Sequence, residues 1–413
     1  MKILVINSGS STIKYQLFDE AVETVHAKGI VARLGEAGSY ISQETPGTSF
    51  RRNVVVHGHH DAFELMVEAL LDPVRGAIRS TSEVTAVGHR AVHGADVFLE
   101  STLITPEVIA KLEECVPLAP LHNPPNLIGI YEGLKLFPNV PHVAVFDTSF
   151  HQTMPPKAYL YAIPLEYYTE HKIRKYGFHG TSCRYVARRA AQLLVRPLES
   201  LKMVIGHLGN GVTIAAVDGG KSIDTSIGFA TFGGVMMGTR TGDIDPGLIF
   251  YLVRNLGMTV DEVEKLYYRQ GGLLGVSGVS NDMRVIVEEA QAGNDRCQLA
   301  LEMFAYRVRS YIGSYAAAMG GLDAVVFTAG IGENSPEVRK LSCEGLGFLG
   351  LTVDDALNKG AGGAGIAIGD RIAIGDYVIS PPDSPTKALV VATNEERMIA
   401  LDTVEIARRH LTI

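Results

Sequence analysis

The sequence ILVINSGSSTIKYQLFD, residues 3–19, indicates the plan on which the chain is built. An apolar run is followed by a turn of small polar residues and by a second run of mixed alternation, which predicts strand, tight turn, strand. The same order recurs about two hundred residues later in MVIGHLGNGVTIAAVDGG, residues 203–220. The two stretches share few residues but one plan, which predicts a duplicated domain; two unrelated hairpins are the alternative.

The length of the chain favours two domains. Its 413 residues exceed the size at which one hydrophobic core keeps growing. Further strand, glycine turn, helix units follow, as in AVVFTAGIGENSPEVRKL at 324–341, and this order indicates α/β layers with ligands at the strand ends. We expect residues 1–150 plus 385–413 to form the first domain, because the last helix crosses back to it, and residues 151–384 to form the second.

Composition excludes several classes of protein. The formal net charge of −8 argues against nucleic acid or an anionic membrane as the main partner, because both attract a basic face. The four cysteines lie far apart with no metal-binding spacing, which is typical of free thiols in a reducing compartment. No segment reaches about eighteen apolar residues in a row, so we expect a cytoplasmic protein with no membrane span.

Three strand-to-turn junctions carry glycines and small polar residues: NSGSST at 7–12, HLGNG at 207–211 and TAGIGENS at 328–335. Neither familiar signature is complete, since Ala215 stands where a P-loop needs its first glycine and GIGENS lacks the last glycine of a dinucleotide fingerprint. Such turns still expose backbone N–H groups that bind phosphate without a lysine. One alone is more often a plain hairpin turn, but three in a duplicated chain predict a nucleotide cleft.

Four cationic or potentially cationic side chains stand beside glycines or prolines. They are Arg90 in GHRAVHG, His122 in LHNPP, His179 in GFHGTS and Arg240 in GTRTGD. Each histidine taken alone is more often structural than catalytic. Together the four residues favour a site for an anionic ligand in a chain that is acidic overall.

Two carboxylates stand at the ends of predicted elements. Asp147 follows the apolar run HVAVF, and Glu395 begins the last helix, where Thr393 and Glu396 fit a capping box. Glu395 could simply favour its own helix N-terminus. With Asn7 from the first turn, it could instead hold Mg²⁺, which takes few protein oxygens together with waters and phosphates.

Ten motifs in one order over the whole length resemble the acetokinase family of acetate, propionate and butyrate kinases. They are NSGSSTIKYQLFD, GHRAVHGAD, PLHNPPNL, FDTSFHQTMP, YGFHGTS, HLGNGVT, MMGTRTGDIDPG, SNDMR, TAGIGENS and TNEE. The resemblance implies two duplicated actin-like, sugar-kinase-like (ribonuclease H-like) α/β domains with a nucleotide cleft between them. It also implies a homodimer that uses ATP with Mg²⁺, or Mn²⁺, for reversible phosphoryl transfer to acetate, giving acetyl phosphate.

The resemblance assigns roles position by position. It implies metal ligands at Asn7 and Glu395, and catalytic roles for Asp147 as acid/base and for His179 and Arg240 in stabilising the transition state. It implies that the substrate carboxylate meets Arg90 and that the rest of the acyl site comprises Val92, Leu121, His122 and Phe178. It implies that the phosphates of ATP meet Lys14, His207, Leu208, Gly209, Asn210 and Gly211. It implies that the adenosine meets Asp282, Met283, Arg284, Gly330, Ile331, Gly332, Glu333 and Asn334.

Elementary chemistry qualifies the role of Asp147. A carboxylate substrate is already ionised at neutral pH, so it needs no general base. The obstacle is repulsion, since two like charges ~4 Å apart cost about 4 kcal/mol at an effective dielectric near 20. We therefore expect Asp147 to organise magnesium waters or a neighbouring cation, rather than to move a proton.

The chain departs from the family in the loop before Arg240. The family commonly reads FTPLEGLMMGTR, whereas this chain reads FATFGGVMMGTR at 229–240. Thr231 replaces a rigid, apolar proline and Gly233 replaces a glutamate, so the size or polarity of the acyl pocket is open. Propionate or another short acid is therefore the alternative substrate, because one methylene changes binding by only about 1–3 kcal/mol.

Two other classes of function remain as alternatives. A sugar or polyol kinase of the same superfamily would share the phosphate turns but would lack a pair of arginines, such as Arg90 and Arg240, directed at an anion. A non-enzymatic, ATP-driven conformational module would need a partner-binding domain, and no extra domain is visible in the sequence.

Overall fold

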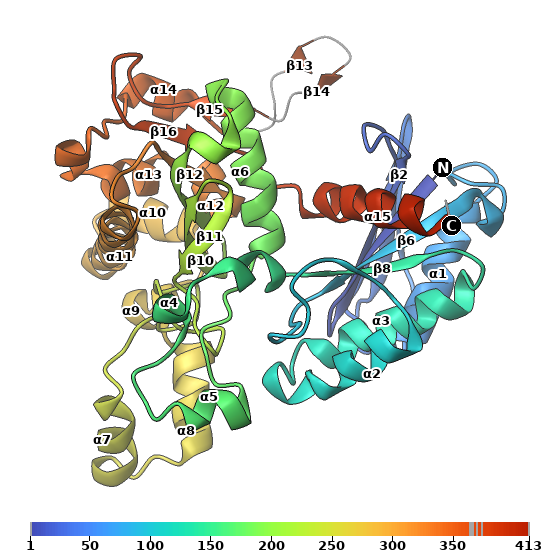
Figure 1. The fold of residues 1–413 in the computed structure, drawn as a ribbon, viewed down its shortest axis with the longest axis horizontal. Helices are drawn as coiled ribbons and strands as arrows, with labels where there is room; N and C mark the ends of the chain where they lie inside the picture. Colours follow the sequence, from blue (N-terminus) through green and yellow to red (C-terminus); the bar gives the residue numbers. More distant parts are fainter. Residues whose placement is uncertain (1, 363–366, 369–370, 373–374, 412–413) are drawn as a thin grey trace. The chain divides into compact units, whose positions relative to one another are not determined.

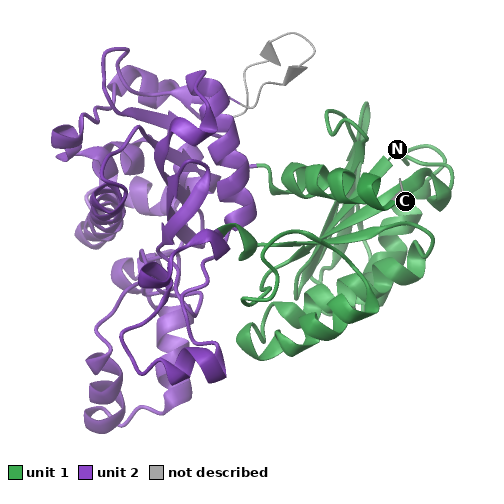
Figure 2. Ribbon diagram, viewed as in Figure 1, with its two compact units in different colours: residues 1–150, 394–413 green, residues 151–393 purple. Residues whose placement is uncertain are grey.

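The computed structural model describes residues 2–362, 367–368, 371–372 and 375–411. The chain divides into two compact units, Met1–Phe150 with Asn394–Ile413, and His151–Thr393 (Figure 2). The return to the first unit comes later than the expected residue 385, because β16 (Lys387–Val390) is still paired with β12 in the sheet of the second unit. The sequence also predicts a mobile loop at the glycine-rich run 360–369, and half of that run lies outside the described residues.

The first unit is a mixed sheet in the order β5-β4-β3-β2-β1-β6-β8-β7, with helices on both faces (Figure 1). Strand β1 is antiparallel to β2 and parallel to β6, which is parallel to β8. The strands are β1 (Lys2–Ser8), β2 (Thr12–Asp19), β3 (Val25–Ala32), β4 (Tyr40–Thr45), β5 (Thr48–Asn53), β6 (Val84–Ala91), β7 (Thr102–Leu103) and β8 (His142–Phe146). The helices are α1 (His59–Leu71), α2 (Pro106–Glu114), α3 (Asn123–Leu136) and α15 (Glu395–Leu411).

The first strand shows why this sheet is covered on both faces. Successive side chains of a strand point to opposite faces. Leu4 and Ile6 of β1 belong to one core cluster with Phe63 of α1. Ile3 and Val5 belong to another with residues of α15. An unbroken apolar run therefore becomes a central strand between two layers of helices.

The second unit repeats the plan with the sheet order β11-β10-β9-β12-β16-β15. Its strands are β9 (Lys202–Leu208), β10 (Val212–Asp218), β11 (Lys221–Thr225), β12 (Ala324–Thr328), β15 (Tyr377–Val378) and β16; a separate short pair is β13 (Ala367–Ile368) and β14 (Arg371–Ile372). Its helices are α4 (Pro156–Tyr159), α5 (Glu166–His171), α6 (Gly180–Leu194), α7 (Gly247–Asn255), α8 (Val260–Lys265), α9 (Gly272–Ser277), α10 (Met283–Gln291), α11 (Asp295–Met319), α12 (Ala329–Asn334), α13 (Pro336–Cys343) and α14 (Asp355–Gly360). Within the described ranges, no helix is long and apolar enough to cross a bilayer.

The two sheets share one five-stranded core. We number the five core strands of each sheet in chain order. Both sheets then place them side by side in the order third, second, first, fourth, fifth: β3-β2-β1-β6-β8 and β11-β10-β9-β12-β16. In both, the first three strands are antiparallel and the fourth and fifth run parallel to the first. The predicted duplication and the ribonuclease H-like α/β class are therefore confirmed.

Two local predictions are wrong. TAGIGENS is not an open glycine turn, because residues 329–334 form the short helix α12, whose Glu333 Oε1 accepts from the N–H of Ala329 at 2.8 Å. The last helix is not capped by Thr393 and Glu396. Asn394 Oδ1 accepts from the N–H of Arg397 at 2.9 Å, while the hydroxyl of Thr393 bonds to Ser182.

A buried histidine links several segments of the second unit. His151 is 0% exposed, and its ring nitrogens lie 2.8 Å from Ser222 Oγ and 3.0 Å from the carbonyl oxygen of Phe178. Burial lowers the pKa of His151 to about 4. The native protein therefore keeps this ring neutral at a pH where an exposed histidine is charged.

This histidine should make the protein less stable in mild acid. The unfolded chain binds a proton at His151 below pH 6.5, whereas the native chain does not. The contribution of neutral His151 to the free energy of unfolding is thus fully present above pH 6.5. As the pH falls from 6.5 to about 4, this contribution is lost at about 1.4 kcal/mol per pH unit. We expect His151→Gln to flatten the fall of urea-unfolding stability between pH 7 and 5, and the exposed control His171→Gln to leave it unchanged. Equal slopes for wild type and His151→Gln would contradict this.

Candidate active site

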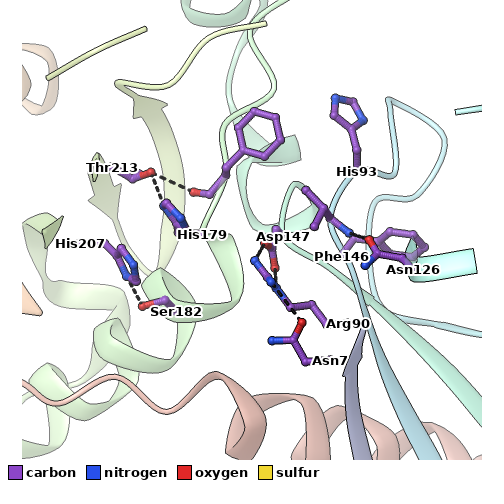
Figure 3. A network of polar contacts seen from close by, with 12 residues as sticks. Asn7, Arg90, His93, Asn126, Phe146, Asp147, His179, Ser182, His207 and Thr213 are labelled. Atoms are coloured by element: carbon purple, nitrogen blue, oxygen red, sulfur yellow. Dashed lines mark hydrogen bonds and ion pairs between the residues drawn. The ribbon is translucent and has the colours of Figure 1, made fainter. Parts of the chain in front are cut away.

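Three parallel strands of the first unit end in polar side chains. Asn7 lies near the end of β1, Arg90 near the end of β6, and Asp147 directly after β8. Because these strands are neighbours, the three side chains meet at one edge of the sheet, where α/β proteins bind ligands. Arg90 lies between the other two (Figure 3).

Asp147 holds the Arg90 guanidinium in a two-point ion pair. Arg90 Nη2 donates to Asp147 Oδ2 at 2.6 Å and Nε donates to Oδ1 at 3.2 Å, while Nη1 donates to Asn7 Oδ1 at 3.3 Å. The Asp147 side chain is 1% exposed and that of Arg90 is 22% exposed. Burial lowers the pKa of Arg90, but the charges of Asp147 and Glu395 outweigh it and raise the pKa overall. Asp147 thus organises a neighbouring cation.

Glu395, the first residue of α15, is a half-buried carboxyl group near this pair. Burial raises its pKa to about 7; the charges of Arg90 and Lys14 oppose that rise, whereas Asp147 adds to it. Lys14 is the cross-strand partner of Asn7. In the part of the chain that the structure describes, no group of three or more His, Cys, Asp and Glu could hold a metal. The carboxyl group of Glu395 and the amide oxygen of Asn7 are oxygen donors of the kind that a hard cation prefers, with its other ligands taken from water or substrate.

The predicted acyl-site residues of the first unit lie in different environments. Val92 is buried, and its N–H donates to Asn126 Oδ1 at 2.9 Å. His122 is the half-buried residue just before α3. Leu121, beside it, is 66% exposed within the chain. Of the predicted acyl-site residues in the first unit, Val92 is therefore buried and Leu121 is exposed.

In the second unit, two predicted histidines stack on each other. The ring centroids of His179 and His207 are 4.3 Å apart and their planes differ by 15° (Figure 3). His179 precedes α6 with a φ of +56°, a left-handed conformation that is uncommon for a residue with a side chain. His207 lies on β9. Phe178, which precedes His179, is buried.

Arg240 lies close to the same histidine. A Cβ built on Gly211 would lie 3.3 Å from Cε1 of His179 and 3.8 Å from Nη1 of Arg240, so both side chains approach one glycine of the HLGNG turn. Arg240 Nη1 donates to the carbonyl oxygen of Thr231 at 2.9 Å. Burial lowers the pKa of Arg240, yet a guanidinium remains charged at neutral pH. The geometry therefore places a charged guanidinium and an imidazole beside one glycine of this turn.

A cavity of about 830 Å³ in the second unit takes in most of the predicted adenosine residues. Its lining includes Gly209, Asn210, Asp282, Met283, Arg284, Gly330, Ile331 and Asn334. The other two predicted adenosine residues lie elsewhere, because Gly332 is buried and Glu333 directs its carboxylate at the N–H groups of Ala329 and Thr393. Leu208, predicted to meet the phosphates, is buried as well. The size of the cavity suits a nucleoside.

Comparison with known proteins shows the family of this chain. The model of the acetokinase family matches residues 2–401. The chain belongs to the acetokinase family. An acetate kinase of Halothermothrix orenii is 51% identical over 98% of this chain and 99% of its own. The crystal structure of Porphyromonas gingivalis acetate kinase superposes with a TM-score of 0.91 at 44% identity, and a propionate kinase from Francisella tularensis with 0.88 at 38%; each covers 98% of this chain and 99% of its own.

Two sets of site residues in this acetokinase were not predicted from the sequence. Asn126 donates to the carbonyl oxygen of Ser8 at 2.7 Å and accepts from the N–H of Val92, so it ties the end of β1 to the exit of β6. The motif PLHNPPNL was visible, but its second asparagine had no assigned role. Val287 and Gln291 also line the cavity. Their spacing of four from Met283 on one helix face was the signal that could have found them.

Proposed function

We propose that this acetokinase transfers the γ-phosphoryl group of ATP to the carboxylate of acetate, reversibly, giving acetyl phosphate and ADP. One observation supports this most directly. A fixed guanidinium, Arg90, is held by Asp147 and Asn7 at the edge of the sheet, in a chain 51% identical to an acetate kinase. A planar guanidinium pairs well with a planar carboxylate.

In this proposal the protein supplies position and charge. Acetate arrives ionised, so the barrier lies in bringing its oxygen to a negatively charged phosphoryl group. Arg90 binds and orients the carboxylate, and Asp147 keeps Arg90 from turning away. Arg240 and His179, gathered at Gly211, stabilise charge on the phosphoryl group during in-line transfer. Asp147 then needs no proton-transfer role.

The cofactor assignment rests on the same residues. The cavity of about 830 Å³ would hold the adenosine, and the HLGNG turn would hold the phosphates through backbone N–H groups. Asn7 and Glu395 would hold Mg²⁺, or Mn²⁺, which when bound neutralises phosphate charge. We also propose the homodimer that the family resemblance implies; its test is the molar mass in solution.

A second substrate is favoured by one specific difference. Thr231 and Gly233 stand where the family commonly has proline and glutamate, and a relative with a TM-score of 0.88 is a propionate kinase. A smaller or more flexible wall would admit one more methylene. Propionate is therefore the alternative acyl acceptor.

The test of the function is a series of acids. We expect acyl phosphate, trapped with hydroxylamine, to form from Mg-ATP and acetate with a higher kcat/KM than from formate, propionate or butyrate. A higher value for propionate would mean that the loop at 231–233 has reshaped the pocket. Absence of acyl phosphate with every acid would refute the proposal.

Replacing Asp147 tests whether it organises charge or moves a proton. Asp147→Asn leaves Arg90 without its buried counter-charge, so we expect the KM for acetate and the Mg²⁺ concentration for half-maximal rate each to rise by about tenfold, as a loss of about 1.4 kcal/mol implies. The exposed control Asp245→Asn should match wild type. A fall in kcat with both concentrations unchanged would restore the acid/base role.

Replacing Arg240 tests its assignment to the transition state. Because a charge that acts mainly in the transition state affects turnover more than ground-state binding, Arg240→Ala should lower kcat by about 100-fold or more and raise the KM for ATP by less than about fivefold. The exposed control Arg254→Ala should behave as wild type. A defect confined to the KM for ATP would contradict the assignment.

A further inference from the structure

Each histidine of the stacked pair is held by a different hydroxyl group. His179 Nδ1 lies 2.8 Å from Thr213 Oγ1, and His207 Nδ1 lies 2.8 Å from Ser182 Oγ. Figure 3 shows one hydrogen bond from each ring, and the ring nitrogen is Nδ1 in both histidines. Thr213 and Ser182 are both fully buried, and Thr213 is the cross-strand partner of His207. The two rings are therefore oriented from opposite sides by groups that can donate or accept.

The partners of Thr213 indicate which way its bond runs. Thr213 Oγ1 also lies 3.4 Å from the carbonyl oxygen of Phe178, which can only accept. A hydroxyl has one proton, so Thr213 donates it to Phe178 and accepts from Nδ1–H of His179. This arrangement holds whether His179 is neutral or charged, because Nδ1 carries a proton in both forms.

The hydrogen bonds of Ser182 are compatible with the opposite direction for His207. Ser182 Oγ lies 2.7 Å from Thr393 Oγ1, and the N–H of Thr393 is bonded to Glu333 at 3.1 Å. If Thr393 donates to Ser182, and Ser182 donates to Nδ1 of His207, both hydroxyl protons are used in hydrogen bonds. His207 is then neutral and carries its proton on Nε2.

We propose that Thr213, Ser182 and Thr393 are positioning residues that hold His179 and His207 in opposite tautomers. His179 is the member that accepts a positive charge, and His207 stays a neutral donor. Two stacked cations with ring centroids 4.3 Å apart would repel each other strongly, so only one of the pair can be charged at once. The proposal rests on the proposed phosphoryl transfer for its kinetic consequence, but the tautomers themselves do not depend on it.

The opposite tautomers of the two histidines would determine how much positive charge lies beside Gly211. His179 and Arg240 both approach this glycine, so a charge on His179 adds to that of Arg240 at one point. A neutral His207 donates a hydrogen bond without opposing that charge. The hydroxyl groups thus decide which histidine contributes charge and which contributes only a donor.

The first test compares matched variants of Thr213. Thr213→Val keeps the shape of the side chain but removes the hydroxyl, and Thr213→Ser keeps the hydroxyl. We expect Thr213→Val to lower kcat by about tenfold, the effect of one hydrogen bond of ordinary strength, with little change in the KM for ATP, and Thr213→Ser to restore most of the rate. Thr225→Val is the control, since the buried Thr225 hydroxyl has no hydrogen-bond partner among the described residues. Equal rates for Thr213→Val and the control would overturn the proposal.

The second test reads the tautomers without any substrate. Imidazole ¹⁵N NMR of the full chain, assigned with His179→Gln and His207→Gln, should show the proton on Nδ1 of His179 and on Nε2 of His207. Thr393→Val should shift His207 toward the Nδ1–H form, and Thr393→Ser should not. The same tautomer at both histidines would overturn the proposal. A chain with the expected spectra but no acyl phosphate product would instead refute only the phosphoryl-transfer function.

Discussion

The need to pair a buried guanidinium organises the first unit. Arg90 projects from the sheet edge with most of its side chain removed from water, and an unpaired charge there would cost several kcal/mol. Asp147 can meet it with both carboxylate oxygens only because β6 and β8 are adjacent and parallel. Asn7 reaches the same group from β1. The strand order therefore decides which residues form the site, and the ion pair fixes the side chain that strand order alone would leave mobile.

The sequence predicted the features that are local or repeated. The duplicated strand plan was visible because a buried strand is an unbroken apolar run, and the two matching sheet orders bear it out. The carboxyl ends of β1, β6 and β8 were likewise marked by polar residues. Long-range pairing was not visible: nothing local shows that 387–390 belongs to the second sheet. The wrong prediction of the helix cap has the same cause. Thr393 has the spacing of a cap residue, but its hydroxyl group is hydrogen-bonded to Ser182, 211 positions earlier.

The candidate site shows the same limit at the level of side chains. The sequence motifs located Asn7, Arg90, Asp147, His179 and Arg240, because charged or metal-ligating side chains in such motifs indicate a binding or catalytic role. Motifs could not show that Asn126 joins two strand ends or that Thr213 and Ser182 orient the histidines, because amides and hydroxyls serve many structural purposes. Their roles depend on which partner atoms lie within hydrogen-bond distance. Such residues are found only once the fold places them.

The departure at 231–233 affects the anchoring of Arg240 less than its residue types suggest. Arg240 is bound by the backbone carbonyl of Thr231, a group that proline at this position would also supply. The loop is closed by Asp243, which accepts from the N–H of Gly234 at 2.7 Å and from Tyr311, and Phe232 packs edge-on against Tyr268. Because a backbone carbonyl group anchors Arg240, the side chains of 231–233 can vary without removing that anchor. In the function proposed above, that freedom would let the acyl pocket change its size while Arg240 keeps its backbone partner.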